Sequence, residues 1–136
     1  MPLMRILLVE SNPADAYLTV EALKHAGLAE GVTVFDDSAK ALSHMREGST
    51  AADLILLDLH VAPLSGLEML AEIRKDPHLG FTPVVIVSGS ENKDDVRQAY
   101  GNGANCYINK PAKLDEFMRF MKTCYEFWGT VATLPR

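Results

Sequence analysis

Short apolar segments alternate with longer amphipathic segments five times along this chain of 136 residues. Two of the apolar segments, residues 53–58 and 83–88, are apolar on both faces of the strand that each would form. Such strands are typical of the interior of a parallel sheet, because helices cover both of its faces. The alternation therefore predicts a three-layer α/β sandwich, with right-handed crossovers joining a five-stranded parallel sheet to five helices.

Residues that start or stop helices set the boundaries of these segments. Asn12 followed by Pro13 predicts a helix start, because asparagine caps a helix and proline suits its first position. Ser38 is expected to cap the second helix in the same way. The predicted strands are residues 4–9, 32–35, 53–58, 83–88 and 104–109. The first two predicted helices end at Gly27 and Gly48, and Leu70 and Ile73 mark the third. The fourth is expected to end near Gly103, and the fifth to run from Lys113 to about Trp128.

The composition is that of one folded domain. The chain is 48% hydrophobic and 23% charged, which argues against a disordered or membrane-spanning protein, and its N-terminus lacks the apolar run of a signal peptide. A net charge of −5 disfavours direct binding to nucleic acid. Cys106 and Cys124 make neither a disulfide framework nor a zinc site. We expect a cytoplasmic protein that binds neither nucleic acid nor membranes.

Polar side chains follow the buried strands at the points where these strands end. Glu10 and Ser11 follow the first strand, Asp58 ends the third, Ser88 ends the fourth, and Lys110 follows the fifth. The carboxyl ends of parallel strands meet at one edge of a sheet, where open α/β folds bind their ligands. Carboxylates suit Mg²⁺, and a lysine and a hydroxyl suit phosphoryl oxygens.

An aspartate beside Mg²⁺ can act as a nucleophile that forms an aspartyl-phosphate. Taken alone, a strand-end aspartate is usually a helix cap or a solvated turn residue, and a lysine before proline is usually on the surface. Taken together, Asp58, Ser88 and Lys110 come from separate strands and offer compatible chemistry at one edge. We therefore interpret them as a site for a phosphoryl group.

The sequence resembles the receiver domain of two-component response regulators (CheY-like) over almost its whole length. Gly66 lies eight residues after Asp58, where the family commonly has a glycine, and Ser88 lies thirty residues after it, at the switch hydroxyl position. The other matching segments are Ile6-Leu7-Leu8-Val9-Glu10, Leu56-Leu57-Asp58-Leu59, and Tyr107 with Lys110-Pro111. The resemblance implies a flavodoxin-like sheet with strand order 2-1-3-4-5.

The resemblance also implies a mechanism. Asp58 would accept a phosphoryl group from a histidine kinase or a phosphotransfer protein, beside a Mg²⁺ ion held by Glu10, Asp58 and the backbone carbonyl of His60. Lys110 would pair with the phosphoryl group. Ser88 would move toward the new oxygen and let the switch aromatic, Tyr107, turn inward, which changes a protein-binding surface. The protein would thus be a switch and not an enzyme.

Ser11 departs from the family pattern, because receivers usually carry a second acid there that binds Mg²⁺ directly. Ser11 is neutral, so we expect weak binding of Mg²⁺. Two hypotheses remain open: a phosphorylated regulator, or a pseudo-receiver that binds proteins with little or no phosphorylation. A flavin- or nucleotide-binding enzyme is disfavoured because no glycine-rich loop follows the first strand. An aspartate-nucleophile phosphatase would want a second acid where His60 stands.

The last predicted helix is apolar on more than one face, which indicates burial on more than one side. We expect Phe120, Phe127, Trp128 and Val131 to form a homodimer interface; the alternative is a tail that folds back onto its own domain. Residues 1–128 would be the receiver domain and 129–136 a tail, which leaves no room for a DNA-binding output domain. The segments 12–16 and 127–135 also resemble stand-alone regulators that partner phytochrome-type kinases.

Overall fold

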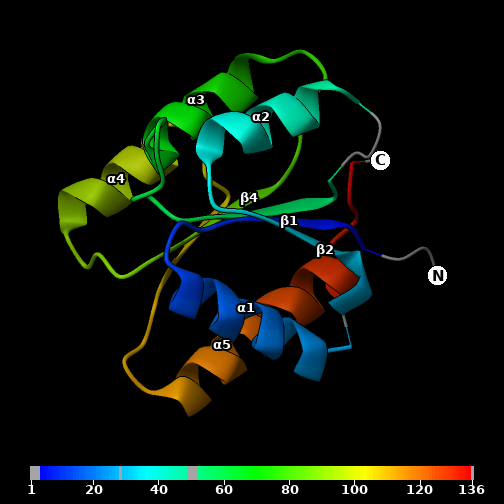
Figure 1. The fold of residues 1–136 in the computed structure, drawn as a ribbon, viewed down its shortest axis with the longest axis vertical. Helices are drawn as coiled ribbons and strands as arrows, with labels where there is room; N and C mark the ends of the chain where they lie inside the picture. Colours follow the sequence, from blue (N-terminus) through cyan, green and yellow to red (C-terminus); the bar gives the residue numbers. More distant parts are fainter. Residues whose placement is uncertain (1–3, 28, 49–51, 136) are drawn as a thin grey trace.

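A computed structural model of the protein describes residues 4–27, 29–48 and 52–135. Its centre is a parallel sheet with strand order β2-β1-β3-β4-β5, as predicted (Figure 1). The strands are β1 (Ile6–Val9), β2 (Val32–Phe35), β3 (Leu54–Leu57), β4 (Val84–Ser88) and β5 (Cys106–Asn109). The first and last residues of each strand lie within two positions of the predicted ones.

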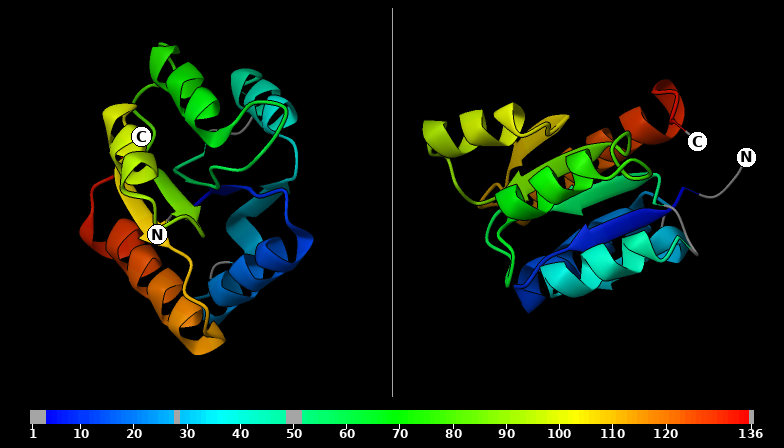
Figure 2. Two further views of the ribbon diagram at one scale, coloured as in Figure 1. Left: turned by 90° about the vertical axis from the view of Figure 1, so that its left-hand side faces the viewer. Right: turned by 90° about the horizontal axis from the view of Figure 1, so that it is seen from above.

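Helices cover both faces of the sheet and complete the three layers (Figures 1 and 2). Two of them, α1 and α5, lie side by side on one face, and the other three cover the opposite face. The helices are α1 (Pro13–His25), α2 (Ser38–Arg46), α3 (Gly66–Lys75), α4 (Lys93–Gly101) and α5 (Leu114–Glu126), with a short 3₁₀ turn at Ala29–Gly31. Among the helices of the described chain, none combines the length and apolar character needed to cross a bilayer.

Alternate residues of the buried strands supply two separate cores. Leu7, Ile55 and Ile86 pack beneath α2 and α3, in a cluster that also contains Leu70 and Ile73. The second cluster lies on the other face and contains Ile6, Leu8, Leu56, Val85, Leu23, Phe117 and Met121. The apolar strands are thus buried on both faces, which is the pattern from which the sequence predicted a parallel sheet.

Side-chain caps start the helices. The Asn12 side chain accepts hydrogen bonds from the backbone N–H groups of Ala14 and Asp15, and Pro13 is the first residue of α1, as predicted. The prediction that Ser38 caps α2 is wrong, because Asp37 is the cap. Ser38 is fully buried and instead bonds the backbone of the loop after β3, where a buried hydroxyl needs partners.

The C-terminal helix begins as predicted, with Lys113 at its cap, and differs from the prediction at its end. Leu114, the first residue of α5, is 55% exposed, and burial against the sheet starts one turn later, at Phe117. After Glu126 the helix widens into a π-helical turn, Phe127–Val131. In the tail that follows, Leu134 packs against the core beneath α1 and α5.

Candidate functional site

Lys110 gathers three carboxylates at the carboxyl edge of the sheet. Its Nζ lies 2.5 Å from Glu10 Oε1, 2.5 Å from Asp58 Oδ2 and 2.9 Å from Asp15 Oδ2. The side chains of Glu10 and Asp58 are almost completely buried, whereas Asp15 is partly exposed. The structure therefore brings together the predicted residues Glu10, Asp58 and Lys110, and adds Asp15 to them.

The ends of two buried strands and the start of one helix place these acids. Glu10 directly follows β1 and Asp58 directly follows β3, so both carboxylates lie at the same edge of the sheet. Asp15 lies in the first turn of α1. Side chains in a helix point back toward its N-terminus, so a first-turn side chain reaches the strand end from which the helix starts.

Asp58 is fixed from both sides. Its Oδ1 accepts a hydrogen bond of 2.8 Å from the backbone N–H of His60, while Oδ2 contacts Lys110. Gly66 packs against the same strand end, since a Cβ at this position would lie 2.4 Å from the carbonyl oxygen of Asp58. The spacing of Gly66 and Asp58 in the sequence thus corresponds to a backbone contact that excludes any side chain.

Burial and hydrogen bonds shift the protonation equilibria of these groups. Burial, partly offset by the bond to Lys110, raises the pKa of Glu10 above its ordinary value. Burial acts in the same direction on Asp58, but the His60 N–H and Lys110 outweigh it and lower the pKa of that carboxyl. Burial disfavours the Lys110 ammonium, yet its three acidic partners raise its pKa overall. At neutral pH, Asp58 is an anion and Lys110 a cation.

The donor atoms of the site suit a divalent metal ion. One carboxylate oxygen each from Glu10, Asp15 and Asp58 lie within 4.8 Å of one another. Ser11 stands beside them, with its Oγ donating to the backbone carbonyl of His60 at 3.4 Å. Carboxylate and carbonyl oxygens are the ligands that Mg²⁺ prefers, so the residues present fit such an ion.

A second set of hydrogen bonds connects the end of β4 to β5 and α4. The buried Ser88 Oγ accepts from the backbone N–H of Ser90 at 3.2 Å. The Ser90 carbonyl accepts from the Tyr107 hydroxyl at 2.8 Å and from the Asn109 amide at 2.6 Å. The Ser90 hydroxyl donates to Asp95, in the first turn of α4. Ser90 therefore joins the predicted switch residues Ser88 and Tyr107, although these two are not bonded to each other.

Comparison with known proteins identifies the family. The sequence model of the response regulator receiver domain matches residues 6–122. The chain belongs to the response regulator receiver domains. This receiver domain is 36% identical to the response regulator Rcp1 of Synechocystis sp. over 135 residues, which cover 96% of this chain and 92% of Rcp1.

Solved structures agree with this assignment. The phosphorylated cyanobacterial phytochrome response regulator RcpA is similar at a TM-score of 0.93 and 39% identity, covering 99% of this chain and 100% of RcpA. The Mn²⁺-bound form of Rcp1 is similar at a TM-score of 0.90 and 35% identity, covering 98% and 99% of the two chains. The resemblance to regulators of phytochrome-type systems is thereby confirmed.

Asp15 is the residue of this receiver site that the sequence analysis missed. The predicted site residues all lie at or near strand ends, whereas Asp15 lies five positions beyond Glu10, inside a helix. The signal that locates it is Asn12-Pro13, which fixes where α1 begins and therefore which side chains face the strand end. The site was expected to lack one carboxylate because of Ser11, and Asp15 was not considered.

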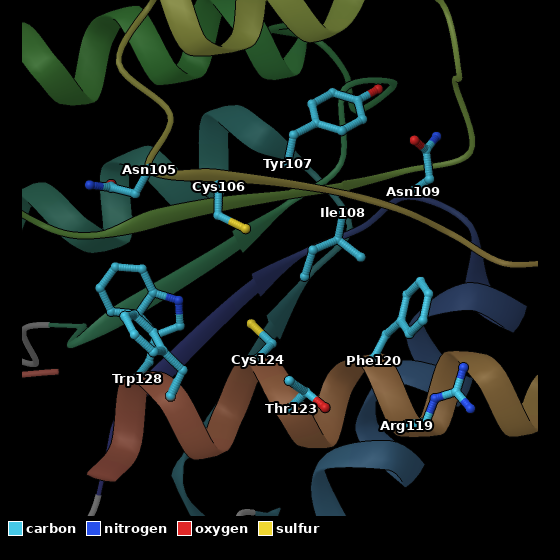
Figure 3. Close-up of a pocket in the computed structure, with 11 residues that line it drawn as sticks. Asn105, Cys106, Tyr107, Ile108, Asn109, Arg119, Phe120, Thr123, Cys124 and Trp128 are labelled. Carbon is cyan, nitrogen blue, oxygen red and sulfur yellow. The ribbon is translucent and has the colours of Figure 1, made fainter. Parts of the chain in front are cut away.

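The expected dimer residues lie on another part of the receiver domain. Phe120, Phe127 and Val131 are 37%, 48% and 72% exposed, whereas Trp128 is partly buried against the core. A hollow of about 800 Å³ lies between α5 and the edge strand β5. In Figure 3, Phe120 of α5 and Trp128 of the π-helical turn that follows it point toward β5 across this hollow.

Proposed function

We propose that this receiver domain accepts a phosphoryl group on Asp58 from the phosphohistidine of a histidine kinase or a phosphotransfer protein. A carboxylate oxygen of Asp58 forms a new bond to phosphorus, the histidine N–P bond breaks, and the ring nitrogen leaves with the bonding electrons. The single observation that carries the proposal is the placement of Asp58, anionic and held between Lys110 and the His60 N–H at the edge of the sheet.

A divalent metal ion, when bound, supplies positive charge that offsets the phosphoryl oxygens in the transition state. Glu10, Asp58 and the backbone carbonyl of His60 are the groups proposed to hold it. Lys110 already lies against Asp58 Oδ2 and provides a second positive charge for the same oxygens. Positioning and electrostatics thus account for the reaction, with no general base required.

The switch is proposed to act through Ser88 and Ser90. A hydroxyl that turns toward a phosphoryl oxygen on Asp58 gives up the hydrogen bond that Ser88 Oγ now accepts from the Ser90 N–H. The Ser90 carbonyl anchors Tyr107 and Asn109, so a shift of this loop changes the surface formed by β5 and α4. Phosphorylation at one edge of the sheet is thereby coupled to a surface that proteins can bind.

Beryllofluoride, which mimics an aspartyl-phosphate, tests this function. With Mg²⁺ present, we expect amide NMR signals of His60, Ser88, Ser90 and Tyr107 to shift in the wild type. Asp58→Asn should show none of these shifts, because the neutral amide offers no carboxylate to the beryllium. A wild type without shifts at high Mg²⁺ contradicts the proposal and favours the pseudo-receiver, for which the neutral Ser11 is the supporting observation.

The partner is proposed to be a phytochrome-type histidine kinase in the cytoplasm. The similarity to RcpA and Rcp1 supports this proposal, since RcpA is a phytochrome response regulator. Phosphotransfer measured from a panel of autophosphorylated kinases tests it. Phytochrome-type kinases should transfer their label faster than the other kinases of the panel, and equal rates across the panel contradict the assignment.

The aromatic face of α5 is proposed to join two copies of this chain, with part of the tail, residues 129–136, in the interface. The exposed Phe120, Phe127 and Val131 and the adjoining hollow beside β5 support this arrangement, with Trp128 at its border. Light scattering should give a dimer mass for the wild type and a monomer mass for Phe120→Ser/Phe127→Ser. Phe81→Ser, at a residue 79% exposed in the loop before β4, is the control that should stay dimeric.

A further inference from the structure

A carboxylate oxygen of Asp15 lies within 4.8 Å of those of Glu10 and Asp58, in a site where the neutral Ser11 stands in place of an acid. We propose that Asp15 is a positioning residue that compensates for Ser11: it holds Lys110 and supplies the third negative charge on which Mg²⁺ binding depends. This inference rests on the proposed function of the site, and it replaces the expectation of weak Mg²⁺ binding that follows from Ser11 alone.

The charge of the cluster supports compensation. Counted with every carboxylate ionised and the lysine protonated, Glu10, Asp15, Asp58 and Lys110 have a formal net charge of −2. A site with an acid in place of Ser11, and no acid in place of Asp15, would carry the same charge. Mg²⁺ bound at either site would meet the same balance of charge, so the loss of an acid at one position is offset at the other.

Ser11 itself does not provide this charge. Its hydroxyl is neutral and donates to the His60 carbonyl, one of the groups proposed to bind the metal. Asp15 reaches the cluster from a different element and contacts Lys110 at 2.9 Å. Without Asp15, the positive charge of Lys110 would be neutralised by Glu10 and Asp58 alone. With Asp15 as a third partner of Lys110, more of the negative charge of Glu10 and Asp58 remains to attract a metal ion.

Asp15 is held in place by the start of α1. The Asn12 side chain accepts from the Asp15 N–H at 3.1 Å, and Pro13 fixes the backbone at the first helical position. A carboxylate on a fixed helix start loses less conformational entropy on binding than one on a mobile loop. The same placement would also let Asp15 stabilise the helix dipole, a purely structural role that an experiment must separate from the proposed one.

Titration with Mg²⁺ alone, followed by amide NMR and by displacement of Mn²⁺ in electron paramagnetic resonance, separates these roles. Asp15→Asn should weaken Mg²⁺ binding by about tenfold or more, the loss typical when a group that orients metal ligands is removed. Asp94→Asn is the matched control, because it removes the same charge from the first turn of α4. A structural role would lower the melting temperature of both variants and leave their Mg²⁺ affinity unchanged.

Rescue provides the decisive arm. Ser11→Asp in the Asp15→Asn background should restore Mg²⁺ affinity to within a few-fold of the wild type. Unchanged affinity in Asp15→Asn, no rescue by Ser11→Asp, or a wild type that does not bind Mg²⁺ overturns the inference. These titrations contain no phosphoryl donor, so a protein that behaves as expected here but never takes up a phosphoryl group contradicts only the proposed function.

Discussion

Lys110 joins segments that lie far apart in the sequence. Its ammonium contacts Asp58, 52 residues away, Asp15, 95 residues away, and Glu10, 100 residues away. The position of Lys110 before Pro111 would not by itself have indicated a site; the prediction came from taking Lys110 together with Asp58 and Ser88 at the ends of other strands. Its contact with Asp15 was not predictable from strand ends, because it depends on which side of α1 faces the sheet.

Cys106 and Cys124 line the hollow between α5 and β5, and the pKa of the Cys124 thiol makes its burial testable. Burial, with a contribution from Cys106, raises the pKa of the Cys124 thiol to about 12. At pH 8, Cys124 is then ionised to the reactive thiolate in about one protein molecule in ten thousand. Alkylation of Cys124 by iodoacetamide, followed by mass spectrometry, should accelerate about tenfold per pH unit from pH 8 to 10.

The unfolded chain in guanidinium is the control for this measurement, and its alkylation rate should level off near the ordinary thiol pKa of 9.0. Because the folded state favours the protonated thiol, the free energy of unfolding falls as the pH rises from 9 toward 12. A folded protein whose Cys124 reacts with the pH profile of the unfolded chain would show that this thiol is not buried.

The order and type of the elements were predictable, because each depends on a local pattern. Apolar runs define the strands, and Asn12-Pro13 defines a helix start. The capping residue of α2 was not predictable from the local sequence, because Asp37 and Ser38 are both good capping residues. Tertiary contacts decide between them. Ser38 bonds to the backbone of Leu64, a contact that joins α2 to the loop after β3.

The approach of α3 to β3 predicts a strong effect at Gly66. A Cβ added there would meet the Asp58 carbonyl oxygen at 2.4 Å and Leu59 Cα at 2.6 Å, both in the backbone. Gly66→Ala should lower the free energy of unfolding by about 1–3 kcal/mol, because neither neighbour can rotate away. Urea denaturation measures the loss, and Mg²⁺ binding should weaken as Asp58 is displaced.

Gly101→Ala is the control for this substitution. Gly101 is the last residue of α4 and has no atom within 4 Å of an added Cβ, so alanine should leave stability unchanged or raise it by up to about 1 kcal/mol. Equal effects of the two substitutions would show that the helix α3 does not pack against Asp58 as described.

Arg74 ties the end of α3 to two loops. Its guanidinium donates to the carbonyls of Gly80, Thr82 and Gly103 and to the side chain of Asn105. Arg74→Lys should cost about 2 kcal/mol of unfolding free energy, because an ammonium cannot bond these acceptors at once. Arg46→Lys, at an exposed ion pair with Glu72, should cost less than about 1 kcal/mol in the same urea denaturation.

Comparable losses for the Arg74 and Arg46 variants would contradict this role for Arg74. The sequence offers no local signal for the contact, since a helical arginine is usually solvated and its partners here lie up to 31 residues away. Such contacts depend on the packing of separate elements, which a local pattern does not contain.

At the scale of the whole molecule, the acidic site around Lys110 and the proposed dimer interface both adjoin strand β5. β5 leads to Lys110 at the carboxyl edge, and its outer side borders the hollow beneath Phe120 and Trp128. Under the proposed function, Ser90 connects them, because its N–H bonds Ser88 and its carbonyl bonds Tyr107 and Asn109. The proposed function therefore predicts that phosphorylation of Asp58 alters this apolar surface without a large rearrangement of the sheet.

Covalent phosphorylation of Asp58 is the central claim, and intact-protein mass spectrometry tests it directly. The protein is incubated with acetyl phosphate and millimolar Mg²⁺, with Asp58→Asn as the control. We predict that the wild type gains the mass of one phosphoryl group and that Asp58→Asn gains none. A wild type of unchanged mass, or an Asp58→Asn variant that is modified to the same extent, would contradict the account.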